Sequence, residues 1–143
     1  MDKPILSSIF CIANNYKRYV SSLNEDTNIS KTNGVSRMII SFICESKEDV
    51  YQKTLENHFG FSRSTASNII TQMENDGLVL REKVNSDQRL KRLILTDNAI
   101  KMYEVLKDDM IKFESIITKD FTKEELKSLN TLLNKLTIAM GKE

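Results

Sequence analysis

The chain has 143 residues, enough for one globular domain with a substantial core. Hydrophobic residues make up 40% of it and charged residues 29%, and the formal net charge is only +1, so whole-chain charge does not indicate a nucleic-acid binder and any basic surface has to be local. No run approaches the roughly 20 apolar residues that span a bilayer, and the N-terminal segment ILSSIFCIA lacks a signal-peptide cleavage site. We therefore expect a cytoplasmic protein with no membrane partner.

The first 46 residues predict two helices. Pro4 suits a first helical turn, and apolar residues then recur every three or four positions to about residue 24. The polar segment NEDTNISKTNG separates this helix from a second one, whose apolar residues run from Val35 to Ile43 and which ends near ESKED. The whole chain has one Pro and four Gly, and this scarcity of helix breakers is typical of a helix-rich protein.

Two short helices are predicted between residues 51 and 77. Val50 is a candidate for a short strand before the first of them, which runs from Tyr51 to Phe59, and Gly60 suits the left-handed turn that ends it. Ser62 is a good N-cap for the second helix, which ends at Asn75-Asp76-Gly77. The apolar side of this second helix should consist of Ala66, Ile69, Ile70 and Met73.

A two-stranded hairpin is predicted next, because the period of the apolar residues changes from helical to alternating. The alternating apolar positions are Leu78, Leu80, Leu93 and Leu95. Between them lies VNSDQ, a turn-forming tip. From Val79 to Arg92 the hairpin carries five basic and two acidic residues, a local charge of +3. The five basic residues are Arg81, Lys83, Arg89, Lys91 and Arg92.

Two longer helices complete the chain. Thr96 caps the first, and Thr122 to Glu125 forms a full capping box for the second. We expect a single domain, residues 1–143, that is mainly α with a small β-hairpin. Residues 50–96 would form a winged helix-turn-helix lobe, and residues 1–46 and 97–143 a helical dimerisation region, because the wide apolar stripes of the terminal helices have no remaining partner inside so small a chain.

The helix-turn-helix and the hairpin together suit one DNA duplex. An α-helix fits the major groove, its N-terminal residues meet base edges, and a hairpin beside it reaches the backbone and the adjacent minor groove. Thr65 lies near the positive helix end that favours phosphate. The side opposite the apolar stripe presents Arg63, Ser64, Ser67, Asn68 and Thr71. The alternatives are a solvated polar helix face and a hairpin whose charges only protect its edge against aggregation.

The sequence also resembles a known family. QKTLENHFGFSRSTASNIITQMENDGLVLRE, followed by SDQRLKRLILT, is similar to the DNA-binding lobe of MarR-type transcriptional regulators, and the flanking helices fit the same pattern, so the resemblance covers essentially the whole chain. Its most specific part is the wing signature of that family, Asp87-x-Arg89 before Leu93-x-Leu95-Thr96. Ala99 stands where family members often have Gly, at the start of a helix that tolerates Ala.

The resemblance implies an obligate homodimer with intertwined first and last helices, and DNA contacts at matching positions. Arg89 matches the wing-tip arginine that enters the minor groove, where a narrow groove concentrates negative potential, and Asp87 matches the carboxylate that orients it. The residues expected to bind DNA are Gln52, Lys53, Arg63, Ser64, Thr65, Ser67, Asn68, Thr71, Arg81, Asp87, Arg89 and Lys91. The resemblance also implies a small aromatic or anionic effector in a crevice between the two lobes. Weaker candidates to line that crevice are Tyr16, Tyr19, Met38 and Phe42.

Other chemistries find little support. His58 has no His or Cys at a spacing that would bind a metal. The chain also lacks a Gly-rich phosphate loop, paired catalytic carboxylates and a Ser-His-Asp set, so we expect no enzyme, no catalytic residue, no metal and no cofactor. Cys11 lies on the first helix, where one branch of the family carries a peroxide-sensing Cys, but its neighbours Phe10 and Ile12 favour an inert thiol. Cys44 is expected to be a core or boundary thiol.

The sequence therefore predicts a sequence-specific regulator of transcription that binds double-stranded DNA, a ligand-responsive repressor acting as a homodimer on a palindromic operator. A winged-helix module that binds a protein partner is the alternative from another class, and a peroxide sensor acting through Cys11 is a third. Ionic strength distinguishes the first two, because DNA affinity should fall steeply as salt rises.

Overall fold

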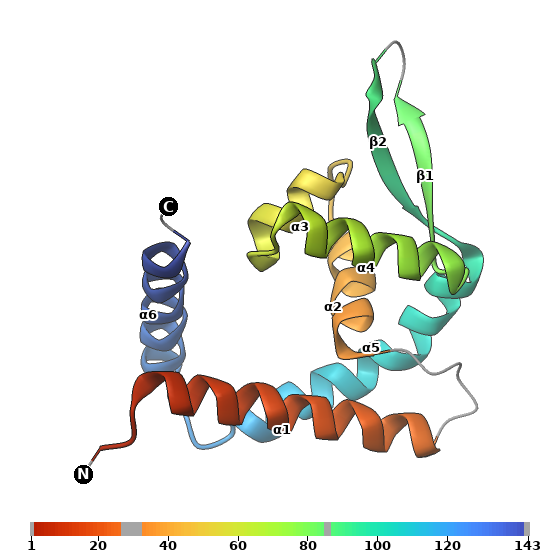
Figure 1. Cartoon of the computed structure of the whole chain (residues 1–143). Coiled ribbons are helices and arrows are strands. Elements are labelled where there is room, and N and C mark those ends of the chain that lie inside the picture. The colour runs from red at the N-terminus through yellow and green to blue at the C-terminus, as the bar shows by residue number, and fades with distance from the viewer. Residues whose placement is uncertain (1, 27–32, 85–86, 142–143) are drawn as a thin grey trace.

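A computed structural model of the protein describes residues 2–26, 33–84 and 87–141, and of residues 24–26 and 87–88 it describes the backbone alone (Figure 1). These ranges contain six helices and two strands. In chain order they are α1 (Ile5–Asp26), α2 (Gly34–Glu45), α3 (Gln52–Phe59), α4 (Arg63–Asn75), β1 (Val79–Val84), β2 (Asp87–Leu95), α5 (Asp97–Thr118) and α6 (Lys123–Met140). The strands pair antiparallel in one two-stranded sheet. The predicted mainly α fold with a small β-hairpin is confirmed.

The segment before α3 differs from its prediction. Tyr51, and not Val50, forms an isolated antiparallel bridge, and its partner is Arg92 of β2. The Val50 carbonyl accepts a hydrogen bond from the Leu93 N–H at 2.7 Å. Tyr51 is also the N-cap of α3, so that helix begins one residue later than expected, at Gln52. The prediction of a strand at Val50 was wrong because the segment meets β2 at a single bridge, but this contact still ties the base of the hairpin to the start of α3.

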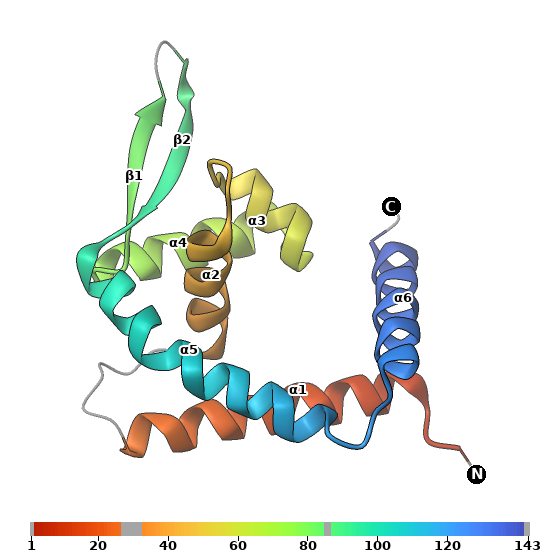
Figure 2. The same ribbon diagram turned by 180° about the vertical axis from the view of Figure 1, so that it is seen from behind.

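The elements form two lobes, which Figures 1 and 2 show from opposite sides. The hairpin, α3 and α4 lie at one end, and the hairpin projects away from the rest of the chain. At the other end α1 lies against the second half of α5, where the rings of Tyr19 and Phe113 stack with centroids 3.7 Å apart. α2 and the first half of α5 run between the two ends, so α5 belongs to both lobes.

The core lies where α2 and α5 meet the hairpin end. Its fully buried large side chains are Ile39, Ile40, Leu55, Ile70, Met73, Leu78 and Val79. They come from α2, α3, α4, the turn after α4 and the start of β1, and the same cluster continues through Leu93 of β2 into Met102 and Leu106 of α5. Because the apolar side of α4 and the base of the hairpin share this core, neither can turn at its base without exposing apolar surface.

The turn between α4 and β1 is held by hydrogen bonds from both sides. Gly77 has φ +71°, a left-handed conformation that favours glycine, and the next N–H, that of Leu78, donates to the Met73 carbonyl at 2.9 Å. From the far end of the hairpin, the Thr96 hydroxyl donates to the Gly77 carbonyl at 2.6 Å. The Thr96 hydroxyl also accepts from the Ala99 N–H at 3.2 Å, as expected for the N-cap of α5. One residue thus joins both ends of the hairpin to α5.

The terminal helices leave much apolar surface uncovered. No residue of α6 is buried in the described chain. The large apolar side chains that α6 exposes are Leu129, Leu132, Leu133, Ile138 and Met140, and those that the N-terminal half of α1 exposes are Ile5, Leu6, Phe10 and Ile12. Within the described ranges, none of the helices has the length and apolar character needed to cross a membrane.

The shared core predicts how substitutions on α4 affect stability. We expect Ile70→Ala to lower the free energy of unfolding by about 2–5 kcal/mol, because it removes buried methyl groups and leaves a cavity. Asn68→Ala on the exposed side of the same helix is the matched control and should change it by no more than about 0.5 kcal/mol. Urea unfolding followed by circular dichroism at one protein concentration measures both. Equal effects of the two substitutions would contradict the placement of α4.

Candidate nucleic-acid interface

α4 presents a polar surface on the side away from the core. Ala66, Ile70 and Met73 are buried, while Arg63, Ser64, Asn68 and Thr71 are exposed and Ser67 is half-buried. The helix begins at Ser62, whose hydroxyl accepts from the Thr65 N–H at 3.2 Å. Short side chains with donors and acceptors can approach base edges closely, and Asn can pair with adenine through two hydrogen bonds. The structure therefore brings the sequence-predicted residues of α4 onto one accessible side.

The start of α3 is fixed against the start of α4. The Gln52 side-chain amide donates to the Arg63 carbonyl at 3.2 Å, which joins the first residues of the two helices. Lys53 forms an ion pair with Glu56 one turn later, at 3.6 Å, and its side chain remains 76% exposed. Gln52 is thus engaged with the protein itself, while the Lys53 ammonium group stays accessible to an anion. The sequence had predicted the same role for both residues, a contact with DNA.

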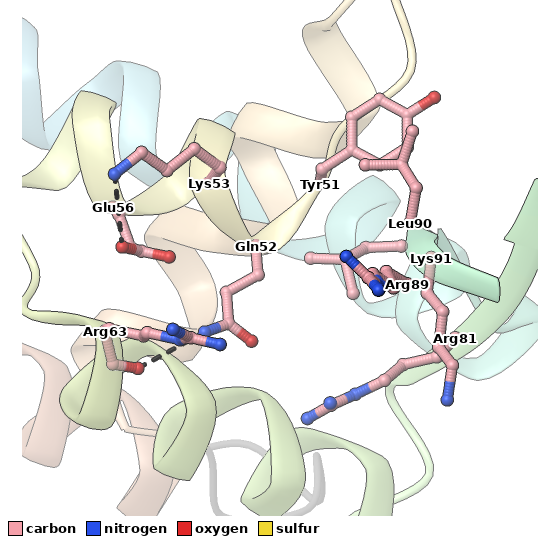
Figure 3. Close-up of a pocket in the computed structure, with 10 residues that line it drawn as sticks. Tyr51, Gln52, Lys53, Glu56, Arg63, Arg81, Arg89, Leu90 and Lys91 are labelled. Atoms are coloured by element: carbon pink, nitrogen blue, oxygen red, sulfur yellow. Dashed lines mark hydrogen bonds and ion pairs between the residues drawn. The ribbon is translucent and has the colours of Figure 1, made fainter. Parts of the chain in front are cut away.

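A basic cleft of about 360 Å³ lies between α3, α4 and the hairpin (Figure 3). Its cationic side chains are Lys53, Arg63, Arg81, Arg89 and Lys91, and Glu56 is the one carboxylate among its lining residues. Gln52, Arg63 and Arg81 also line an open depression at the start of α4, together with Ser62, Ser64 and Ser67. The polar side of α4 and the basic cleft therefore form one continuous surface, which we call the basic face. Five cations converging here make a strongly positive surface in a chain with almost no net charge.

The hairpin divides its charges between its two sides. Arg81 lies opposite Leu93 and Lys83 opposite Lys91, on the side of the strands that also carries buried Val79. Glu82 and Arg92 form the alternate pair and so point to the other side. The basic residues of the hairpin therefore do not all lie on one side, and Arg92 lies outside the basic face.

Arg92 is neutralised by two carboxylates. Its guanidinium lies 2.8 Å from the Glu82 carboxylate, across the hairpin, and 3.4 Å from that of Asp49, before α3. The hydrogen bond to Glu82 is the main cause of a raised pKa of Arg92. This arginine stabilises the outer side of the hairpin base. The sequence held a signal for the first pairing, since residues facing each other across a hairpin are often of opposite charge, but Asp49 is distant along the chain.

The other charged residues of the hairpin that were expected to bind DNA differ in their surroundings. Arg89 is exposed and lines the basic cleft. Asp87, expected to orient Arg89, begins β2, but its side chain lies outside the described residues. Arg81 is engaged with α4: its Nε lies 2.8 Å from Glu74 Oε1, and a terminal nitrogen donates to the Thr71 hydroxyl at 3.3 Å. Glu74 was not among the residues that the sequence predicted for this site.

A second cavity, of about 370 Å³, is lined by α1, α2, the second half of α5 and α6. No described residue of α3, α4 or the hairpin is among its lining residues, so it does not lie between the two lobes. Tyr16, Tyr19 and Met38 line it, whereas Phe42 lies elsewhere, stacked on His58 with ring centroids 4.2 Å apart. Arg37 also lines the cavity and is only 3% exposed. Burial lowers the pKa of Arg37 and raises the pKa of Tyr16. The signal for Arg37 in the sequence was a charged residue three positions before Ile40, on the apolar side of the second helix.

Neither cysteine lines the basic face. Cys11 is exposed on α1, where the Asn15 amide donates to its sulfur at 3.8 Å. Cys44 is half-buried near the end of α2, and burial, with the charge of Glu104, raises the pKa of its thiol. A raised pKa lowers the thiolate fraction at neutral pH and therefore the reactivity of Cys44. Among the described residues, no three His, Cys, Asp or Glu side chains are grouped so that they could hold a metal ion.

Comparison with known proteins agrees with this geometry. A model of the MarR family matches residues 42–91, which span the end of α2, α3, α4 and most of the hairpin. The homoprotocatechuate degradative operon repressor of Escherichia coli is 35% identical over 79 residues, which are 55% of this chain and 53% of the repressor. The chain thus matches about half the length of this relative.

Solved structures match over nearly the whole chain. A MarR family regulator from Listeria monocytogenes, solved with 26mer DNA, superposes with a TM-score of 0.79 at 23% identity, over 98% of this chain and 91% of that one. The transcription regulator MarR from Oenococcus oeni has a TM-score of 0.74 at 26% identity, over 92% of this chain and 97% of that one. Residues 42–91 thus match the MarR family, and the chain as a whole shares the fold of solved MarR family regulators.

Proposed function

We propose that the protein is a transcriptional regulator that binds double-stranded DNA in a sequence-specific manner as a homodimer. The observation that supports this most directly is the basic face, where the polar side of α4 continues into the cleft beneath the hairpin. An enzyme would need reactive groups gathered in a pocket, and this surface offers cations and short polar side chains, which suit a polyanion.

The parts of the basic face match the grooves of one duplex. α4 enters the major groove, where Ser67 and Asn68 meet base edges, and the hairpin reaches the neighbouring minor groove with Arg89. Lys53 and Lys91 contact phosphates and position the protein without reading sequence. The related fold solved with 26mer DNA supports this docking, and the related Escherichia coli operon repressor supports repression as the mode of action. A palindromic operator would follow from the twofold symmetry of a homodimer.

The two halves of the interface should respond differently to substitution. Arg89→Ala should weaken binding to all duplexes and reduce the slope of log affinity against log salt by about one unit, because it loses a contact with the phosphate field. Asn68→Ala should cost about 1–3 kcal/mol on the preferred duplex and little on scrambled DNA, because it removes a base contact. Titrations against both duplexes at several salt concentrations measure this.

Lys101→Ala, an exposed cation on α5 outside the basic face, is the matched control and should leave the salt slope unchanged. If Arg89→Ala changes neither affinity nor slope, the hairpin is not a DNA-contacting wing. The module that binds a protein partner would then explain the fold better.

The homodimer rests on the uncovered apolar surface of the terminal helices. α6 has no buried residue within the described chain, although it exposes Leu129, Leu132 and Leu133 on one side. A helix with such a stripe is stable in water only when another surface covers it. We place a second copy of α1 and α6 there, because the same stripe on a partner chain supplies an apolar surface of matching size and closes the assembly with twofold symmetry. Two α4 helices would then face two half-sites.

Leu133→Asp should dissociate the dimer or unfold it, since the interface would bury an unpaired carboxylate. Thr131→Asp places the same charge on the opposite side of α6, where the residue is exposed, and should leave the dimer intact. Sedimentation at micromolar concentration, with circular dichroism to follow helix content, distinguishes a dimer from the 16.5 kDa monomer. A monomeric parent protein would contradict the proposal.

The cavity lined by α1, α2, α5 and α6 is our proposed effector site. Its walls carry the stacked rings of Tyr19 and Phe113, and the buried guanidinium of Arg37 lies among its lining residues. A planar aromatic acid fits both features, because its ring packs on apolar walls while its carboxylate pairs with the guanidinium. An effector there would contact α1, α2 and α5, which connect the dimerisation region to α4.

Two probes of equal size test the charge requirement. Benzoate should raise Tm by about 2 °C or more at concentrations well above its Kd, and uncharged benzyl alcohol should raise it less, because only benzoate pairs with Arg37. Differential scanning fluorimetry with each compound, at constant ionic strength, provides the comparison. Equal shifts would exclude recognition of a carboxylate in this cavity.

A further inference from the structure

α4 and the hairpin are linked by side chains as well as by the core. Glu74 lies in the last turn of α4 and Arg81 in the middle of β1, on either side of the turn at Gly77. Their charged atoms are 2.8 Å apart, and the guanidinium also donates to the Thr71 hydroxyl at 3.3 Å. The two side chains are 27% and 35% exposed, so solvent screens this pair less than an open surface pair.

The position of Glu74 is otherwise unfavourable. A carboxylate in the last turn of a helix opposes the negative end of the helix dipole, and α4 has no basic residue in that turn. Its partner Arg81 belongs to the basic face, where four other cations could bind a polyanion. A negative charge here repels phosphate, so the contact with Arg81 has to supply a compensating benefit.

The benefit lies in the geometry of the hairpin. β1 has six residues, so the tip is about 20 Å from the base, and a rotation of about 10° at the base moves the tip by about 3 Å. The minor groove is about 6 Å wide, so such a shift would misplace Arg89 while α4 stays in the major groove. An ion pair near the base, which joins β1 directly to α4, restricts this rotation.

We propose that Glu74 is a positioning residue that holds Arg81, and through it the hairpin, at the angle where α4 and the hairpin tip meet the same duplex. Arg81 then acts as a strut between helix and hairpin instead of as a phosphate contact. This inference rests on the proposed DNA binding, but the strut itself is a property of the free protein. The two can therefore be tested separately.

Hydrogen–deuterium exchange of the DNA-free protein tests the strut. Glu74→Gln keeps the shape of the side chain and removes its charge, and we expect the β1 amides to exchange about fivefold faster. Buried amides of α2, at Ile39 and Ile40, report whether the whole domain has been destabilised. The matched control is Asp76→Asn, which removes the charge of a neighbouring carboxylate that accepts a hydrogen bond from the Gln72 side chain of α4 at 3.0 Å. Unchanged exchange in β1 would overturn the proposal whether or not the protein binds DNA.

The sign of the effect on DNA affinity gives a second test. If charge alone mattered, Glu74→Gln would bind DNA more tightly, because a negative charge leaves the basic face. A strut predicts about fivefold weaker binding to the preferred duplex with the salt slope unchanged. Tighter or equal binding by Glu74→Gln would overturn the proposal.

Exchanging the two charges separates a strut from a phosphate contact. The double variant Glu74→Arg, Arg81→Glu restores the ion pair in reverse, and it should recover parental β1 exchange and bind DNA to within about threefold of the parent. Arg81→Glu alone should lose both. If the double variant binds DNA no better than Arg81→Glu alone, Arg81 contacts phosphate directly and the proposal fails.

Discussion

The apolar contact between α4 and the base of the hairpin is the constraint on which the rest of the molecule depends. Ile70 and Met73 from the helix are buried with Leu78, just before β1, and with Val79, the first residue of β1. Because the two elements share one core, their polar sides are carried outward together and form one surface. The hairpin extends beyond this core, so its orientation depends on contacts near its base. There Arg81 joins β1 to α4, and the bridge at Tyr51 joins β2 to the start of α3.

The positive surface depends on this packing. The chain has a net charge of only +1, but five cations line one cleft, because alternate residues of a strand point to opposite sides of the hairpin. Arg92 goes to the outer side and pairs with Glu82 and Asp49, while Arg89 and Lys91 line the cleft. A local field of this kind attracts a polyanion over distances of about a Debye length, near 10 Å at 0.1 M salt.

α5 provides the physical connection between the two lobes. Its first half contributes Met102 and Leu106 to the core beside the hairpin, and its second half carries Phe113, which stacks on Tyr19 in the wall of the second cavity. A single helix thus contacts both the cavity and the core that holds α4 and the hairpin base. Under the proposed function, this gives an effector a mechanical route to the recognition helix.

The sequence by itself determined the order of the elements and their approximate first and last residues, because the signals for these act within a few residues. The caps at Thr96 and Thr122 bond to groups three positions away, and alternation alone identified the hairpin. Only the tertiary structure decided which charged residues line the basic face and which pair within the protein. Arg92 pairs with Asp49, 43 residues away, and residues of four helices line the cavity beside Arg37. The partner of Arg92 and the surroundings of Arg37 depend on the packing of distant elements, which no local pattern in the sequence encodes.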